Sequence, residues 1–240
     1  MPKSMTMKLG HKLTILTLAM LIVPCLVSAA IRVEHYAKKD GLAGTVVSDI
    51  LHDSRGYMWI GTWEGLSRFD GKEFVNYSEG DATSIPYLHN RVMRVYEDGL
   101  GNVWVMMYDD RLFRLNRRTD TFDRMAEVFP DFQNVRMYNP LFTARGDVWA
   151  EVRGTGAIHF IADSATNALS AEMVPLVGQA INFLHEDSRG TVWAATDKRL
   201  SVLRSDSLHF NTLADHHDIR AVAETGLKVI WGTADGSIIE

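Results

Sequence analysis

Tryptophan recurs along this chain at a nearly constant interval, and that interval constrains the fold more than any other feature. Five of the six tryptophans are separated by 45, 45, 44 and 38 residues. They are Trp59, Trp104, Trp149, Trp193 and Trp231. Four of them follow a glycine by three residues: Gly56, Gly101, Gly146 and Gly190. Three of those glycines follow an aspartate by three residues: Asp53, Asp98 and Asp187. A fixed period of this length is typical of a structural repeat.

Each repeat predicts four short β-strands. The aspartate and the glycine suit a tight turn, in which the carboxylate caps the turn and the glycine takes a left-handed conformation. β-rich runs flank the turn, a third run follows at residues 66–69, 112–115, 157–160 and 200–203, and a fourth at residues 73–77 and 121–123. No segment after residue 30 has a convincing helical period. We therefore predict an all-β fold, a β-propeller of four-stranded antiparallel blades, with about five blades present.

The two ends of the repeat region carry separate predictions. Val33–Tyr36 resembles the fourth-strand sequence Phe74–Tyr77, so we expect residues 32–36 to close the propeller by completing its last blade. The sequence given stops at residues 236–240, inside an expected third strand. Either five blades close here, or these blades are part of a larger propeller, which is the interpretation we favour.

Residues 1–30 are predicted to be a signal peptide, with residues 31–240 forming the blades. Three lysines precede an apolar stretch at residues 13–27, and small residues follow at 28–30. A membrane anchor is one alternative, although the stretch is short for a bilayer span and contains Pro24. Acylation of Cys25, as in a lipoprotein, is another. We expect an exported protein.

The composition excludes several classes of function. Removal of residues 1–30 leaves 22 basic and 30 acidic residues, a formal charge of −8, which gives no general attraction for nucleic acid. Cys25 is the only cysteine, so a mature chain would have neither disulfides nor thiolate metal ligands. No phosphate-binding glycine motif or serine nucleophile motif is present, and we predict no cofactor.

Residues 53–62 and 64–74 resemble the two-component regulator propeller repeat. The segments Lys39–Leu42 and Ser84–Pro86 are also similar to the linking segments of that family. The resemblance is close in the first two units, recognisable in the fourth, and degenerate in the third and fifth.

This resemblance implies the N-terminal, ligand-sensing part of a bacterial two-component sensor. Such repeats usually build paired seven-bladed propellers in the periplasm, followed by a membrane helix and a cytoplasmic histidine kinase or diguanylate cyclase module. The resemblance implies a homodimeric, membrane-anchored full-length sensor that responds to a carbohydrate breakdown product. We therefore expect an oligosaccharide ligand and no catalytic activity in this chain.

Candidate ligand-binding residues lie where the repeat varies. The ladder tryptophans, glycines and aspartates are interpreted as structural, because the same position in every blade packs between blades. Trp63 is off this ladder, in a loop between a second and a third strand, and loops of a propeller carry its specificity. The candidates in these loops, or in loops leading into first strands, are Trp63, Glu64, Tyr87, His89, Asn90, Arg91, Tyr108, Asp109, Asp110, Arg153, Asp197, Lys198 and Asp235.

Other sites and functions remain alternatives. His216 and His217, between Asp215 and Asp218, have no second cluster at ligand spacing, so we predict no metal site. A sialidase-like exported hydrolase would need convergent carboxylates, and no spacing selects them here. A propeller that binds only proteins is a third possibility, because a fold does not determine a function.

Overall fold

The structure is a computed structural model, and it describes residues 33–77, 91–132, 135–163, 165–166, 168–176, 180–203, 210–226 and 228–240. The predicted signal peptide lies outside these residues. The chain divides into a unit of residues 1–35 and a unit of residues 36–240. In the first unit, residues 33–35 are described, and they form no helix or strand.

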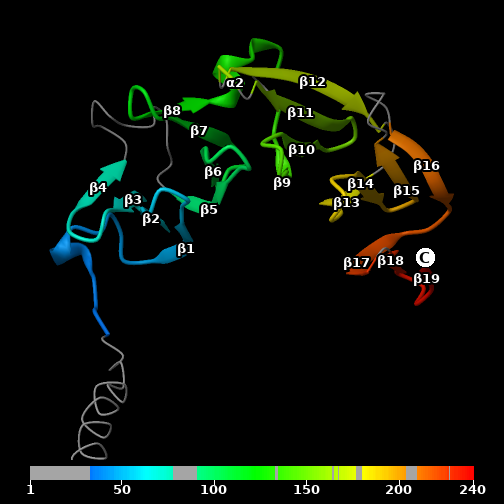
Figure 1. Ribbon diagram of the computed structural model, residues 1–240, viewed down its shortest axis with the longest axis horizontal. Helices are drawn as coiled ribbons and strands as arrows, with labels where there is room; N and C mark the ends of the chain where they lie inside the picture. The colour runs from blue at the N-terminus through cyan, green and yellow to red at the C-terminus, as the bar shows by residue number, and fades with distance from the viewer. Residues whose placement is uncertain are drawn as a thin grey trace, which may run out of the picture. The chain divides into compact units, whose positions relative to one another are not determined.

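The second unit contains five antiparallel sheets, and each sheet takes its strands from one stretch of chain (Figure 1). The first sheet consists of β1 (Val47–His52), β2 (Met58–Thr62), β3 (Gly65–Phe69) and β4 (Phe74–Tyr77). The second consists of β5 (Val92–Glu97), β6 (Val103–Met107), β7 (Leu112–Asn116) and β8 (Thr121–Arg124). The third consists of β9 (Tyr138–Phe142), β10 (Val148–Val152), β11 (Gly156–Ala162) and β12 (Leu169–Pro175).

The fourth sheet consists of β13 (Ile181–Glu186), β14 (Val192–Thr196), β15 (Arg199–Leu203) and β16 (Phe210–Asp215). The fifth has three strands among the described residues: β17 (Ile219–Thr225), β18 (Lys228–Thr233) and β19 (Ile238–Ile239). Short helical turns occur at Lys38–Asp40, at α2 (Met125–Val128) and at Pro130–Phe132. Within each sheet the strands follow chain order, as predicted for propeller blades.

The turn between the first two strands is held by the aspartate of the repeat. In the first sheet, Oδ1 of Asp53 accepts hydrogen bonds from the backbone N–H groups of Arg55 and Tyr57 at 3.0 and 2.9 Å. Its Oδ2 accepts the indole N–H of Trp59 at 2.9 Å. Gly56 has φ of 89°, a left-handed conformation that favours glycine. The predicted turn is therefore present, and the carboxylate also fixes the ladder tryptophan.

The same arrangement recurs in the second and fourth sheets. Asp98 accepts the indole N–H of Trp104 at 2.8 Å, and Asp187 accepts that of Trp193 at 3.1 Å. In the third sheet Thr143 replaces the aspartate, and its hydroxyl exchanges hydrogen bonds with the backbone of Asp147. The degenerate third unit therefore keeps the turn through a smaller side chain.

A cationic or titratable side chain lies opposite the ladder tryptophan in the first three sheets. Arg68 pairs with Trp59 across the strands, with its guanidinium 5.7 Å from the ring, and Arg114 lies at the same distance from Trp104. In the third sheet His159 takes this position and stacks on Trp149 with ring centroids 3.8 Å apart. Nothing in the spacing of the tryptophans indicated this cross-strand partner.

Trp231 corrects one part of the predicted ladder. In the fourth sheet Trp193 lies three residues before Thr196, which pairs with the start of β13. In the fifth sheet the equivalent of Thr196 is Thr233, so Ile230 occupies the ladder position. Successive side chains of a strand point to opposite faces. This one-residue offset therefore turns Trp231 toward the fourth sheet, where its ring lies tilted against that of Trp193 with the centroids 5.2 Å apart.

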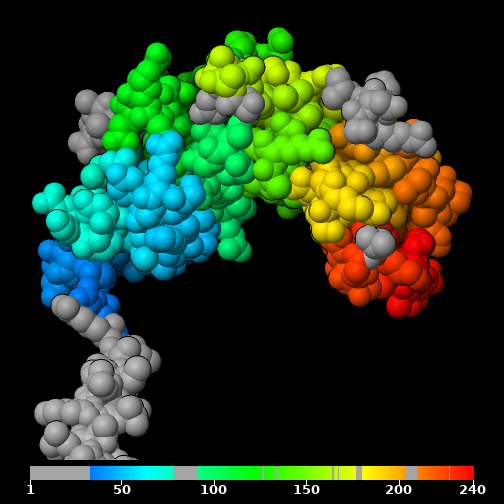
Figure 2. Space-filling view, in the orientation of Figure 1, coloured from blue at the N-terminus to red at the C-terminus, as the bar shows by residue number. Residues whose placement is uncertain are grey.

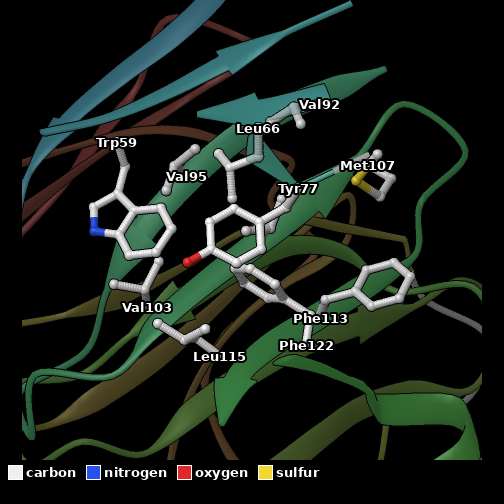
Figure 3. Close-up of a cluster of buried hydrophobic side chains, with 11 residues drawn as sticks. Trp59, Leu66, Tyr77, Val92, Val95, Val103, Met107, Phe113, Leu115 and Phe122 are labelled. Carbon is white, nitrogen blue, oxygen red and sulfur yellow. The ribbon is translucent and has the colours of Figure 1, made fainter. Parts of the chain in front are cut away.

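Neighbouring sheets pack through apolar side chains. Figure 3 shows the cluster between the first two sheets, where Trp59, Tyr77 and Phe122 come together from β2, β4 and β8. Trp59 and Tyr77 stack at 5.7 Å, and Phe122 meets both rings edge-on. Figure 2 shows the atoms of these two sheets in contact. Burying rings of this size contributes about 1.5–3 kcal/mol per side chain.

Acidic side chains also join three of the four described turns to the next sheet. Glu97 at the end of β5 accepts hydrogen bonds from the backbone N–H and the hydroxyl of Ser54 in the preceding sheet. Glu186 accepts the N–H of Ala144, and Glu224 accepts both donors of Ser188. Consecutive sheets therefore present their turns on the same side.

The first strands carry a second link at their opposite ends. A register shift places Ser48 in a bulge of β1, and its hydroxyl donates to the carbonyl of Val92 in the second sheet at 2.7 Å. Asn182 occupies the corresponding bulge of β13, and its amide donates to the carbonyl of Ile219 at 2.7 Å. These bulge side chains pair with main-chain acceptors of the neighbouring first strand.

The segment before the first sheet differs from the prediction of a closing strand. Among the described residues of the predicted segment, 33–36, none belongs to a strand. Tyr36 instead packs on the first sheet, with its ring 4.9 Å from Phe69 and 5.7 Å from Phe74. The aromatic surface of β3 and β4 thus provides a nearer partner for Tyr36 than a distant sheet edge.

Candidate functional site

The sheets have two chemically different ends. We call the end with the aspartate turns the turn end, and it comprises residues 53–56, 98–101, 143–146 and 187–190. The opposite end, where first strands begin and second strands end, we call the loop end. It carries residues 63–64, 108–111, 153–155, 197–198 and 234–236 between the second and third strands of the five sheets. The described sequence candidates all lie at the loop end.

Trp63 and Arg91 meet at the loop end of the first two sheets. The Trp63 N–H donates to the carbonyl of Val46, which continues the pairing of β1 and β2 by one step. Arg91 leads into β5 and places its guanidinium 4.9 Å from the Trp63 ring. Trp63 is 46% exposed, whereas Trp59 and Trp104 of the same two sheets are buried. The two sequence candidates therefore form one cation–π pair at the surface.

The Glu64 carboxylate is already bound by neighbouring groups of the chain. Its carboxylate lies 2.6 Å from Nζ of Lys38 and accepts the backbone N–H of Thr45. The hydrogen bond from Lys38 is the main reason that the pKa of Glu64 is lowered from its ordinary value. This candidate is thus an ionised carboxylate already paired with a lysine.

Tyr108, Asp109 and Asp110 form the loop of the second sheet. Tyr108 is 64% exposed, and its N–H donates to the carbonyl of Arg91 at 3.0 Å. Asp109 pairs with Arg111 at 2.6 Å. Asp110 has φ of 63°, and its carbonyl accepts the N–H of Met137 at 3.3 Å. The loop therefore connects Arg91 on one side to the beginning of the third sheet on the other.

Arg153 and Tyr138 form a second cation–π pair, in the third sheet. The Arg153 guanidinium lies 3.8 Å from the centre of the Tyr138 ring. Glu151, two residues earlier, is 3% exposed and accepts the Asn139 amide at 2.8 Å. Burial raises the pKa of Glu151, although Asn139 and the charge of Arg153 oppose that shift. Neither Tyr138 nor Asn139 was a candidate from the sequence, and both lie in strand β9 rather than in a loop.

The candidates of the last two sheets have structural partners. Asp197 accepts the backbone N–H of Ala180 at 3.0 Å, and the backbone N–H of Lys198 donates to Thr196. Asp235 accepts hydrogen bonds from the Thr233 hydroxyl and the Ser237 N–H, which lower its pKa to about 2. The structure thus uses both aspartates to close local turns. Tyr87, His89 and Asn90 lie outside the described residues.

Two arginines at this end have no carboxylate within ion-pairing distance among the described residues. Most arginines of the described chain lie within 4 Å of a carboxylate, in the pairs Arg68–Asp120, Arg94–Asp49, Arg111–Asp109, Arg117–Asp53, Arg124–Glu127, Arg189–Asp187, Arg199–Asp215 and Arg220–Asp218. Arg91 and Arg153 have no such partner among the described residues. Asp110 is the acidic candidate whose carboxylate also lacks a partner there.

Two other kinds of site receive no support from the described residues. Within them, no group of three or more His, Cys, Asp or Glu side chains is arranged to hold a metal ion. His217 donates its backbone N–H to the carbonyl of Lys198, and His216 extends into solvent. None of the described helices is long and apolar enough to cross a membrane.

A pocket of about 470 Å³ lies between the fourth and fifth sheets. Its walls include Trp193, Leu200, Val229, Trp231 and Ile239. At two other interfaces a fourth strand places a phenylalanine edge-on against the ladder tryptophan, Phe122 against Trp59 and Phe210 against Trp149. The described part of the fifth sheet has no fourth strand and therefore no such phenylalanine against Trp193. We interpret the pocket as the space that this side chain fills at the other two interfaces.

Comparisons with known proteins agree with this architecture. The sequence profile of the family described as "Two component regulator propeller" matches residues 41–64. This segment contains the first aspartate turn and ends with Trp63 and Glu64. Residues 41–64 are therefore similar to the two-component regulator propeller repeat, in agreement with the resemblance inferred from the sequence. A curated relative, histidine kinase P4 of Formosa agariphila, is 46% identical over 48 residues, which are 19% of this chain and 4% of the relative.

Solved structures establish the fold class. An extracellular domain described as that of a hybrid two-component system from B. thetaiotaomicron superposes with a TM-score of 0.54 at 18% identity, over 86% of this chain and 31% of that one. Virginiamycin B lyase from Staphylococcus aureus superposes with a TM-score of 0.51 at 14% identity, over 81% and 69% of the two chains. The fold is an all-β propeller, and the chain spans less than a third of the two-component domain.

Proposed function

We propose that this chain is part of the periplasmic, ligand-sensing propeller of a two-component sensor. The observation that carries the proposal is the family repeat at residues 41–64, in a chain whose sheets have the propeller fold. The lysine-rich, apolar segment at residues 1–30 supports export. In this proposal the chain itself has no catalytic role, and a kinase or cyclase module elsewhere in a full-length, homodimeric protein produces the response.

The ligand in this proposal is an oligosaccharide that binds at the loop end. Trp63 and Tyr108 leave large aromatic surfaces exposed, and the apolar C–H face of a sugar ring can stack on such surfaces. The residues of the loops vary between sheets, whereas the turn end repeats one hydrogen-bond pattern. Binding residues commonly lie on loops that a rigid scaffold positions.

In this proposal, ligand binding is coupled to the output through the packing between neighbouring sheets. A ligand that contacts loops of two or three sheets would favour one packing of those sheets over another. Such a difference in affinity, typically about 1–3 kcal/mol, is the free energy available to change the output. Dimerisation of the sensor would carry the shift across the membrane.

A cellular experiment tests the proposal. The full-length gene, with wild-type or Trp63→Ala sequence, is expressed in a deletion strain, and transcription of its target genes is measured against a panel of oligosaccharides. We expect at least one oligosaccharide to induce a response that Trp63→Ala loses. Val75→Ala, at a residue 40% exposed on β4, is the matched control and should respond normally. The absence of a wild-type response to every oligosaccharide would overturn the proposal.

A further inference from the structure

We propose that the loop end of the first three sheets selects an anionic oligosaccharide, with Arg91 and Arg153 as the residues that bind its carboxylate or sulfate groups. This inference rests on the proposed function and adds the charge of the ligand to it. It concerns the surface formed by Trp63, Arg91, Tyr108, Tyr138 and Arg153, which we call the arginine–aromatic surface.

The first argument is that two arginines of this surface have no acidic partner among the described residues. The carboxylates beside this surface are largely neutralised, Glu64 by Lys38 and Asp109 by Arg111. Arg91 and Arg153 have no carboxylate within 4 Å among the described residues. Guanidinium groups bind carboxylate and sulfate through two parallel hydrogen bonds, and these are stronger than bonds to neutral groups. Arg91 and Arg153 therefore each present a guanidinium that no described carboxylate within 4 Å pairs, on a repeat region whose formal charge is −8.

The second argument concerns how the two arginines are held. Each guanidinium lies over an aromatic ring, Arg91 at 4.9 Å from Trp63 and Arg153 at 3.8 Å from Tyr138. The ring contacts one face of the guanidinium and leaves the N–H groups at its edge free to donate. An arginine held in this way loses less conformational freedom when a ligand binds. The unpaired arginines of the turn end, such as Arg118, have no ring beneath them among the described residues.

The third argument concerns the length of the surface. One ring contact and two backbone hydrogen bonds connect neighbouring parts of it. The Arg91 guanidinium lies on the Trp63 ring, the Tyr108 N–H donates to the Arg91 carbonyl, and the Asp110 carbonyl accepts the N–H of Met137, next to Tyr138. The loops that carry this surface are thus neighbours from the first sheet to the third. A chain of sugars with repeated anionic groups fits this layout better than a single small anion does. The unpaired Asp110 carboxylate would disfavour an anionic group placed directly against it.

Titration calorimetry on the full chain tests the proposal. The probes are oligosaccharides of a hexuronic acid, the same compounds with their carboxylates methyl-esterified, sulfated oligosaccharides, and neutral oligosaccharides. We expect the uronate or sulfated compounds to bind, with affinity that falls as salt rises. Methyl esters should bind at least about tenfold more weakly, a difference of about 1.4 kcal/mol.

Variants assign the effect to the two arginines. Arg91→Ala and Arg153→Ala should each weaken binding of the anionic compound by about tenfold or more, whereas Arg91→Lys should retain part of the affinity. Arg118→Ala, an arginine at the opposite end of the sheets, is the control and should bind normally. Thermal melting of each variant confirms that it is folded.

The outcomes separate this inference from the proposed function. Binding of a neutral oligosaccharide that depends on Trp63 but not on Arg91 would overturn the inference and leave the proposed function in place. Equal binding of the uronate and its methyl ester would also overturn the inference. If no saccharide of any charge binds, both proposals are contradicted.

Discussion

The turn end and the loop end of the sheets use charged side chains in different ways. At the turn end, Asp53, Asp98 and Asp187 are buried, and nearby backbone or indole N–H groups saturate their carboxylates. At the loop end, Arg91 and Arg153 lie on aromatic rings at the surface and have no carboxylate partner among the described residues. The comparison teaches that the repeated hydrogen bonds of the turn end stabilise the sheets, whereas the varied positions of the loop end are available for the binding that we propose.

The largest effect should follow from removing a turn-end carboxylate. Asp98 is 5% exposed and accepts hydrogen bonds from Leu100, Asn102 and the Trp104 indole. Asp98→Ala leaves these buried donors unsatisfied, and each costs about 1–3 kcal/mol, so we expect a loss of about 4 kcal/mol. Urea denaturation measures it, with the exposed Asp131→Ala as control. A loss below about 1 kcal/mol would remove the assigned role of this carboxylate.

Acid should weaken the turn end specifically. Burial alone would raise the pKa of Asp53, but hydrogen bonds from Trp59, Tyr57, Arg55 and Arg117 outweigh it and lower the pKa. The same balance lowers the pKa of Asp187. Because the pKa is lower in the folded state, the stabilisation is complete well above pH 4 and is lost as pH falls below the ordinary aspartate value.

Melting curves between pH 6 and pH 2.5 check this dependence. We expect the Tm to fall by several degrees over the acidic part of that range, and to fall less in Asp53→Asn, which cannot ionise. An identical pH dependence in the wild type and this variant would show that Asp53 is not a source of the effect.

The third sheet offers a gain-of-stability test of the same comparison. Thr143 stands at the position of the turn aspartate, three residues before Gly146 and six before Trp149. Thr143→Asp restores the full motif, and its second oxygen can accept the Trp149 indole as Asp53 accepts that of Trp59. We expect an increase in unfolding free energy of about 1 kcal/mol. Thr143→Val, which loses the hydrogen bonds with Asp147, should instead be destabilised, and a stable Val variant would contradict the reasoning.

The smallest expected effect concerns the links between sheets. Glu97 accepts two hydrogen bonds from Ser54 in a partly exposed position, so Glu97→Ala should cost about 0.5–1 kcal/mol. Hydrogen exchange should become faster at the Ser54 amide, while the amides of β6 and β7 keep their protection. Uniformly faster exchange would mean that the glutamate does more than connect these two sheets.

Much of the fold was predictable because the repeat encodes it locally. The period of the tryptophans and the Asp–Gly spacing predicted the turns and strands, and β4 covers the residues Phe74–Tyr77 expected as a fourth strand. Trp231 was assigned to the ladder because it is also a tryptophan. The strand pairing of the fifth sheet shows that it lies one residue away from the ladder position. The closing role predicted for residues 32–36 depended on a non-local contact, and a short sequence similarity does not determine such contacts.

The candidate site was predictable only as a set of loops. The spacing correctly placed Trp63, Tyr108 and Arg153 at one end of the sheets. It could not show which charged side chains have a hydrogen-bond or ion-pair partner within the fold and which do not. Glu64, Asp197 and Asp235 satisfy partners that lie elsewhere in the fold. Tyr138 was missed because its role depends on Arg153, fifteen residues away, and only the pairing of β9 and β10 brings the two together.

The central claim, that the turn end provides stability and the loop end provides binding, is tested most directly by two variants measured in parallel. Asp187→Asn and Arg91→Ala are each melted and titrated with the anionic oligosaccharide that the wild type binds. We predict a lowered Tm with an unchanged Kd for Asp187→Asn, and an unchanged Tm with a Kd raised about tenfold or more for Arg91→Ala. A lowered Tm in Arg91→Ala, or equal changes of Kd in both variants, would contradict the account.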